Sequence, residues 1–226
     1  MRPAHTLPGA CPVTWAVVAA NAATFVLSFV GFDVRLSFHP AWAAARPWTA
    51  LTYALDGGGS VLALVLSAYA LWLFGGSLER AWGGREYARF LALSTVLPAL
   101  ALWGAASALG RSVGLSGLWL PVAACAVAWS VVNPGERLLV YFALPVEGRW
   151  IGWLAVALVF FSFPFPLGAF ALAGCAFAYW FSRVGRYAFG PRPPVRLRNP
   201  LDVYRRWRRK REFRRLLRRS GLDDLH

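Results

Sequence analysis

Charged side chains are scarce in this sequence, whereas long apolar runs are frequent. Only 15% of the 226 residues are Asp, Glu, Lys or Arg, whereas 58% are apolar and the mean hydropathy is +0.48. A soluble domain carries roughly 25% charged residues. This composition excludes an ordinary soluble fold, and we expect the apolar residues to face lipid as well as a protein core.

Cysteine, histidine and lysine are also rare, which limits the available chemistry. The three cysteines, Cys11, Cys125 and Cys175, lie far apart, so they form neither a disulfide framework nor a metal-binding spacing. We expect small buried packing residues there, and we expect no metal and no cofactor. The histidines and the single lysine lie outside the predicted spans, at His5, His39, His226 and Lys210.

The net charge of +14 is concentrated near the C-terminus. Residues 183–226 hold 15 of the 24 basic residues and four of the ten acidic ones. A proline-rich linker there precedes a predicted helix at 201–217, in which arginines are interspersed with apolar residues. Such a helix is typical of attachment to an anionic leaflet. Nucleic acid is a less favoured partner, because no nucleic-acid-binding motif accompanies the arginines.

Five windows free of Asp, Glu, Lys, Arg and His approach or exceed the roughly 20 apolar residues that cross a bilayer. They are residues 12–32, 57–78, 90–110, 112–135 and 150–182. The last window is too long for one span, and Pro164-Phe165-Pro166 divides it into two. We therefore predict an all-α, polytopic membrane protein with six spans and a basic C-terminal tail. The apolar stretch 138–144 is too short to cross, so we expect an interfacial or re-entrant segment there.

Six spans place both termini on one side, and arginines in short loops indicate which side. That side receives the tail together with Arg2, Arg80, Arg85, Arg89, Arg137 and Arg149, whereas the other receives Arg35, Arg46 and Arg111. We predict a multi-pass cell-membrane protein with a short cytoplasmic N-terminus (1–11), a membrane domain (12–183) and a cytoplasmic tail (184–226). The excess of arginine over lysine favours a bacterial inner membrane. Six tryptophans near span ends fit an interfacial belt: Trp42, Trp48, Trp82, Trp103, Trp119 and Trp150.

Two sequence blocks flank the predicted second span. PWTALTYAL contains Trp48 and Thr52 ahead of a glycine-rich turn, and ALWLFGGSLERAWGGREYARFL contains Gly75, Glu79 and Arg80. We interpret Glu79 and Arg80 as a structural ion pair or a hydrogen-bonded clamp that closes the loop to the third span.

Two further blocks lie downstream. The tetrapeptide Gly114-Leu115-Ser116-Gly117 opens the fourth predicted span, and NPGERLLVYFALPVEGRW connects the fourth span to the fifth. From about Pro47 to Trp180, the four blocks in this order resemble the rhomboid family of intramembrane serine proteases. The tetrapeptide is similar to the G-x-S-G motif that holds the nucleophile of that family.

The resemblance implies a rhomboid-like bundle with Ser116 at the nucleophile position, but the expected partners of that serine are missing. Ala171 occupies the position of the sixth-span histidine, three residues before Gly174. Ala63 and Ser67 occupy the second-span positions whose histidine and asparagine stabilise an oxyanion in the family. Because serine is a weak nucleophile without a base, we predict a pseudoprotease.

Other interpretations of these residues are open. His39 could act as the base only if the first outer loop folded over Ser116, and the resemblance places that loop away from it. Ser116, Gly114 and Gly117 also fit the role of small residues that let the fourth span pack closely. We expect Asn21, a polar residue in the first span, to make an interhelical hydrogen bond.

Three functions fit this sequence. The favoured one is binding of transmembrane client proteins without cleavage, with membrane lipids and such clients as partners. The alternative is an active intramembrane serine endopeptidase with Ser116 as nucleophile. The third is a membrane anchor whose basic tail binds lipid or nucleic acid.

Overall fold

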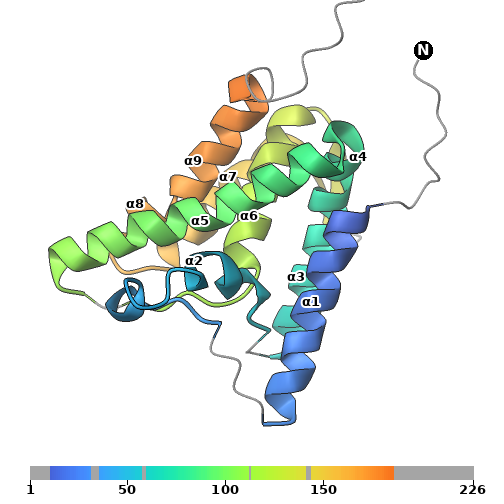
Figure 1. Ribbon diagram of the computed structural model, residues 1–226. Helices are drawn as coiled ribbons and strands as arrows, with labels where there is room; N and C mark the ends of the chain where they lie inside the picture. Colours follow the sequence, from blue (N-terminus) through green and yellow to red (C-terminus); the bar gives the residue numbers. More distant parts are fainter. Residues whose placement is uncertain (1–10, 32–35, 58–59, 112, 141–143, 186–226) are drawn as a thin grey trace, which may run out of the picture. The chain divides into compact units, whose positions relative to one another are not determined.

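The computed structural model describes residues 11–31, 36–57, 60–111, 113–140 and 144–185 (Figure 1). All of these lie in the first of two compact units, Met1–Gly190. The tail linker and its predicted helix at 201–217 lie outside the described residues, as do His5, Lys210 and His226.

The six predicted spans are confirmed as six apolar helical segments. Three of the described helices are long and apolar enough to cross a membrane, and three are shorter and apolar. In chain order the segments are α1 (Pro12–Phe29); α3 (Val61–Ala70), η3 (Leu71–Gly75) and α4 (Gly76–Trp82) as one continuous helix; α5 (Gly84–Leu109); α6 (Trp119–Val132); α7 (Gly148–Phe161); and α8 (Leu167–Ala171), α9 (Ala173–Trp180) and η4 (Phe181–Gly185). The fold is therefore an all-α, polytopic membrane bundle.

Proline and glycine set several of the boundaries. Pro164-Phe165-Pro166 separates α7 from α8, as predicted. Proline interrupts a helix because it has no N–H to donate to the carbonyl four residues earlier. Gly83, with φ +89°, ends α4 and turns the chain directly into α5. The fourth window was predicted to begin at residue 112, but α6 begins only at Trp119, so the G-x-S-G tetrapeptide lies in a turn ahead of the helix.

Two short helical segments fill the connection between the first and second spans. These are η1 (Pro40–Trp42), followed by α2 (Thr49–Thr52) with η2 (Tyr53–Leu55). Three of the six tryptophans expected at span ends are found at such ends: Trp82 ends α4, Trp119 begins α6 and Trp150 lies in the first turn of α7.

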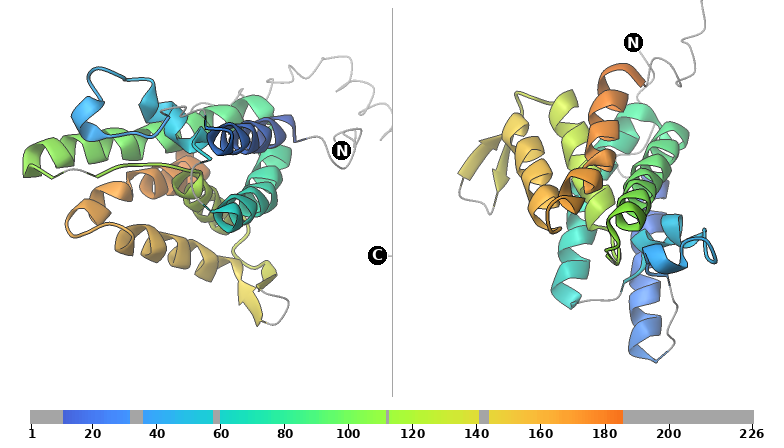
Figure 2. Two further views of the ribbon diagram at one scale, coloured as in Figure 1. Left: turned by 90° about the horizontal axis from the view of Figure 1, so that it is seen from below. Right: turned by 90° about the vertical axis from the view of Figure 1, so that its left-hand side faces the viewer.

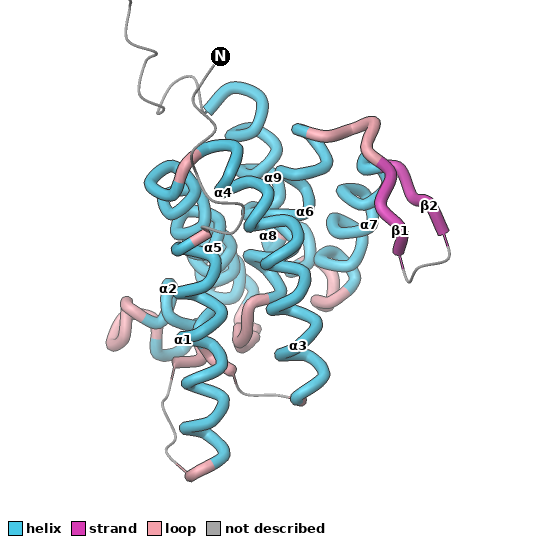
Figure 3. The backbone as a smooth tube through the Cα atoms, turned by 90° about the vertical axis from the view of Figure 1, so that its right-hand side faces the viewer, coloured by secondary structure: helices cyan, strands magenta, loops and turns pink. Residues whose placement is uncertain are grey.

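The stretch at 138–144 does not cross as a helix, as expected, and its place at the membrane surface stays a prediction. Residues 137–147 contain an antiparallel pair, β1 (Arg137–Val140) and β2 (Leu144–Glu147), in which Arg137 is paired with Glu147 (Figure 3). The pairing satisfies the backbone groups of this stretch without a helix. A hairpin therefore connects α6 to α7.

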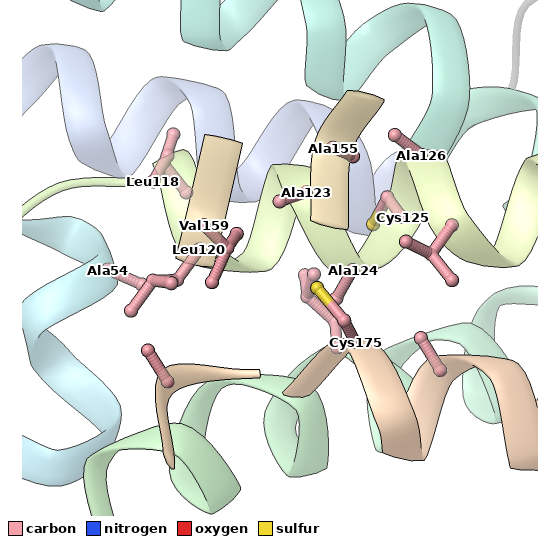
Figure 4. Packing of buried hydrophobic residues seen from close by; sticks show 14 of the residues in the cluster. Ala54, Leu118, Leu120, Ala123, Ala124, Cys125, Ala126, Ala155, Val159 and Cys175 are labelled. Atoms are coloured by element: carbon pink, nitrogen blue, oxygen red, sulfur yellow. The ribbon is translucent and has the colours of Figure 1, made fainter. Parts of the chain in front are cut away.

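Helix α6 lies at the centre of the bundle. Ten of its 14 residues are buried, and many of them are alanines, including Ala123, Ala124 and Ala128. Small side chains allow neighbouring backbones to approach closely when lipid provides no hydrophobic drive. Figure 4 shows α6 packed in this way, with Ala124 beside Cys175 of α9. By contrast, none of the ten residues of α3 is buried, and the right-hand view of Figure 2 shows α1 and α3 reaching below their neighbours.

Candidate functional site

The turn that carries Ser116 is fixed by backbone hydrogen bonds on two sides. Leu115 and Phe38 exchange both of their N–H···O bonds, each 2.8 Å long, as an isolated antiparallel bridge. The Gly117 N–H donates to the Tyr53 carbonyl oxygen at 2.9 Å. The loop between the first and second spans and η2 therefore fix the neighbours of Ser116 on both sides.

This bridge corrects the expected path of the first outer loop. The loop was predicted to lie away from Ser116, but Phe38 pairs with its neighbour and the His39 ring packs on Gly114. A Cβ atom added to Gly114 would lie 2.7 Å from His39 Cε1 and 3.1 Å from Nδ1. His39, from the loop between the first and second spans, thus lies close to the Ser116 turn, and the hydrogen bonds of the described residues include none that joins the His39 and Ser116 side chains.

The two glycines of the tetrapeptide are favoured over larger residues for different physical reasons. At Gly114 an added Cβ atom would displace the His39 ring, which packs on this glycine. Gly117 has φ +81°, which L side chains rarely adopt. The interpretation that Ser116 lets the fourth span pack closely is wrong, because Ser116 is exposed and precedes α6.

Ser116 borders a small hollow together with the two second-span positions that the resemblance singled out. The hollow measures about 120 Å³. We call it the outer hollow and define it by its lining: Asn21, Asp56, Gly57, Ser60, Ala63, Leu64, Ser67, Ser116, Gly117, Leu118 and Trp119. Five of these side chains are polar, so the hollow provides hydrogen-bonding groups beside an apolar helix.

Sequence reasoning missed part of this lining. Ser60 accepts a hydrogen bond from the Ala63 N–H at 3.1 Å and so caps the first turn of α3. A serine directly after a glycine-rich turn was a signal that could have marked this helix start. Asn21 is buried, and its Nδ2 donates to the Ala54 carbonyl oxygen at 3.1 Å. Its expected hydrogen bond exists, but the acceptor lies in η2 rather than in another span.

The sixth-span position is apolar and enclosed. Ala171 is 1% exposed, belongs to the hydrophobic core and does not line the outer hollow. Gly174 lies where α9 crosses α5: an added Cβ atom would meet the Ser94 carbonyl oxygen at 2.9 Å and Pro98 Cγ at 3.3 Å. Close helix packing accounts for this glycine.

Glu79 forms a hydrogen-bonded clamp, but on a different partner from the one expected. Its carboxylate accepts from the Val13 and Thr14 N–H groups, both at 2.9 Å, and from Thr14 Oγ1 at 2.7 Å. It therefore caps the N-terminus of α1 rather than the loop to the third span. Arg80 Nη1 donates to Cys11 Sγ at 3.2 Å on the same side.

The remaining motif residues have structural roles. Gly75 leaves room for the hydroxyl of Tyr87, with which an added Cβ atom would collide. Thr52 Oγ1 donates to the Trp48 carbonyl oxygen at 3.3 Å within α2. Trp48, 59% exposed, and Thr52 thus lie ahead of the second span, at and within the short helix α2.

The three cysteines are buried and form no disulfide, as expected for packing residues. Within the described part of the chain, no three His, Cys, Asp or Glu side chains gather as metal ligands.

A family model described as a eukaryotic integral membrane protein, DUF1751, matches residues 11–184. This range covers nearly all of the six apolar helical segments and the turn that carries Ser116. The chain belongs to the DUF1751 family of integral membrane proteins. No curated protein matches the chain. Because the DUF1751 description names eukaryotic proteins, it gives no support to the bacterial inner membrane, which stays a prediction from arginine usage.

Proposed function

We propose that this protein is a rhomboid-like membrane protein that binds transmembrane segments of other proteins without cleaving them. One observation carries the proposal: Ser116, Ala63 and Ser67 border the same hollow, whereas Ala171 is enclosed in the core. The positions of the nucleophile and of the two oxyanion residues border one hollow, but the sixth span has no base at the position of the family's histidine. Loss of the base lowers the rate of serine-dependent catalysis by orders of magnitude.

The second span offers a surface to such a client. Its N-terminal part, α3, has no buried residue, whereas α5 buries ten of its 26 residues. Ala63, Leu64 and Ser67 of α3 also line the outer hollow. Small side chains permit close approach between membrane helices, and a hydroxyl can hydrogen-bond across the contact. A client helix packed on α3 would therefore lie beside the polar hollow.

Site-specific photocrosslinking in the native membrane tests this proposal. A photoreactive residue at Leu66 of α3, which is 50% exposed, is compared with one at Leu93 of α5, which is 44% exposed. We expect crosslinks from Leu66 to integral membrane proteins, fewer from Leu93, and a loss at Leu66 when Ser67→Trp fills the hollow. Equal capture from both positions, or lipid alone at Leu66, would contradict the proposal.

A second candidate is an active intramembrane serine endopeptidase with Ser116 as nucleophile and His39 as base. The contact of the His39 ring with Gly114, two residues before Ser116, favours it. The two candidates differ in whether a serine-directed reagent labels Ser116. The third interpretation, a lipid- or nucleic-acid-binding tail, depends on residues outside the described ones.

We further propose that both termini face the cytoplasm. Arg80 contacts Cys11 at the start of α1, and Arg149 lies at the start of α7, next to the end of the sixth span. Arg111, assigned to the other side, donates to the Phe165 carbonyl oxygen at the turn between α7 and α8. Arginine-rich loops favour the cytoplasmic side. Cysteine-accessibility labelling of Arg85→Cys and Arg46→Cys from either side of sealed vesicles tests this orientation.

A further inference from the structure

A larger groove lies at the other end of α6, away from Ser116. It has a volume of about 660 Å³ and is walled by α6, α7 and the sixth span. Small-molecule sites typically measure about 300–1,000 Å³. Val127, Val156, Leu172 and Ala176 form much of the apolar wall, and two arginines, Arg149 and Arg183, belong to the same lining.

The two arginines line the same groove from different spans. The fifth span begins at Gly148 and the sixth ends in η4, so the two spans run in opposite directions, and Arg149 and Arg183 face one groove from different walls. Arg149 is the second residue of α7, and Arg183 lies in η4. The groove therefore has a cationic end and an apolar length.

The guanidinium groups keep donors available for an anion. Arg149 Nη2 contacts Glu147 Oε2 at 2.6 Å, and 64% of the Arg149 side chain is exposed. Arg183 Cζ lies 4.8 Å from the centre of the Tyr179 ring. A guanidinium has five N–H donors in a fork that matches phosphate oxygens, so one carboxylate contact leaves several donors free.

The apolar length matches part of an acyl chain. At 1.5 Å per helical residue, Val156 lies about 10 Å along α7 from Arg149, and Leu172 lies about 16 Å along the sixth span from Arg183. At the floor, Gly152 lets α7 approach Ser130, whose Oγ donates to the Val127 carbonyl oxygen and is thereby satisfied. Trp153, 70% exposed, and Tyr179, 47% exposed, line the groove where it opens to the surroundings.

We propose that this groove binds one anionic glycerophospholipid, with its phosphate between Arg149 and Arg183 and one acyl chain along Val127, Val156 and Leu172. Charge complementarity decides the occupant. An apolar partner helix would offer neither cation an anionic group. A phospholipid carries an anionic phosphate at one end of an acyl chain, which matches the cationic end and the apolar length of the groove. This site is separate from the outer hollow and does not depend on client binding.

The test uses the full chain in lipid nanodiscs that contain a trace of photoactivatable lipid, either phosphatidylglycerol or phosphatidylcholine. Crosslinked peptides are mapped by mass spectrometry, because the basic tail can bind anionic lipid elsewhere. We expect phosphatidylglycerol to label the helices of the groove several-fold more than phosphatidylcholine. Arg149→Gln and Arg183→Gln should each lower that labelling about fivefold, and Ala176→Trp should remove it by filling the groove.

Matched controls separate this site from general attraction to arginine. Arg89 pairs with Glu86 at 3.0 Å and its side chain is also 64% exposed, so Arg89→Gln should leave labelling of the groove unchanged. Ala16→Trp places the same bulk on an exposed position of α1. Equal labelling by the two lipids would overturn the proposal, as would labelling that survives the double arginine replacement. Capture of a protein by a photoreactive residue at position 176 would also overturn it. The arginine variants keep the test decisive if Ala176→Trp fails to fold.

Discussion

Replacing Glu79 with glutamine should release the N-terminal end of α1 from the second span. The carboxylate is 3% exposed and accepts three hydrogen bonds from Val13 and Thr14. Glutamine has one acceptor oxygen, so either Val13 or Thr14 would face an NH₂ group instead. A hydrogen bond to a charged group contributes about 1.5–3 kcal/mol, and a negative charge at a helix N-terminus adds about 0.3–1 kcal/mol. We therefore expect a loss of about 2–4 kcal/mol.

Two assays measure this effect. Reversible unfolding in mixed micelles gives the change in the free energy of unfolding. Alkylation of Cys11, which is 1% exposed at the start of α1, reports local release before global unfolding. Thr14→Val should destabilise by less, and its effect should not add fully to that of Glu79→Gln, because both changes remove the same contact.

The control is Glu136→Gln, which changes the same functional group at an exposed position of the turn before β1. Its effect should stay within about 0.5 kcal/mol. If Glu79→Gln and Glu136→Gln have the same free energy of unfolding, and Cys11 stays protected from alkylation, Glu79 does not hold α1 in this way.

Three glycine substitutions test the packing and the turn. Gly174→Leu should destabilise the bundle by disrupting the α5–α9 contact, whereas Gly104→Leu, whose Cβ position has no atom within 4 Å, should be tolerated in the same unfolding assay. Gly75→Ala should cost about 1–3 kcal/mol by overpacking against Tyr87, and Tyr87→Phe should recover part of that loss if the hydroxyl is the obstacle. Gly117→Ala should cost about 1–2 kcal/mol through its positive φ, and chemical shifts of the Ser116 turn should move; unchanged shifts would mean that the turn does not require glycine.

The apolar windows were sufficient to predict the six spans because each depends on a local property. A run of apolar residues long enough to cross a bilayer, or a proline that interrupts one, acts within its own segment. The same logic failed at residues 113–118, which were included in an apolar window but form a turn ahead of α6. Hydropathy alone does not distinguish an apolar loop or strand from a helix.

The surroundings of Ser116 depended on long-range pairing that local patterns do not encode. The bridge between Phe38 and Leu115 joins segments on either side of two spans, and it brings His39 onto Gly114. Sequence alignment to a motif could place Ser67 and Ser116 in one site, and the structure does bring both to the outer hollow. It could not show that Ser116 precedes α6 and is exposed.

Activity-based labelling of the purified full chain with a fluorophosphonate tests the central claim most directly. We predict no labelling that depends on Ser116: the signal of the wild type should equal that of Ser116→Ala and of His39→Ala. Labelling that is lost in both variants would mean that the protein is not a pseudoprotease and would establish Ser116 and His39 as a working nucleophile and base.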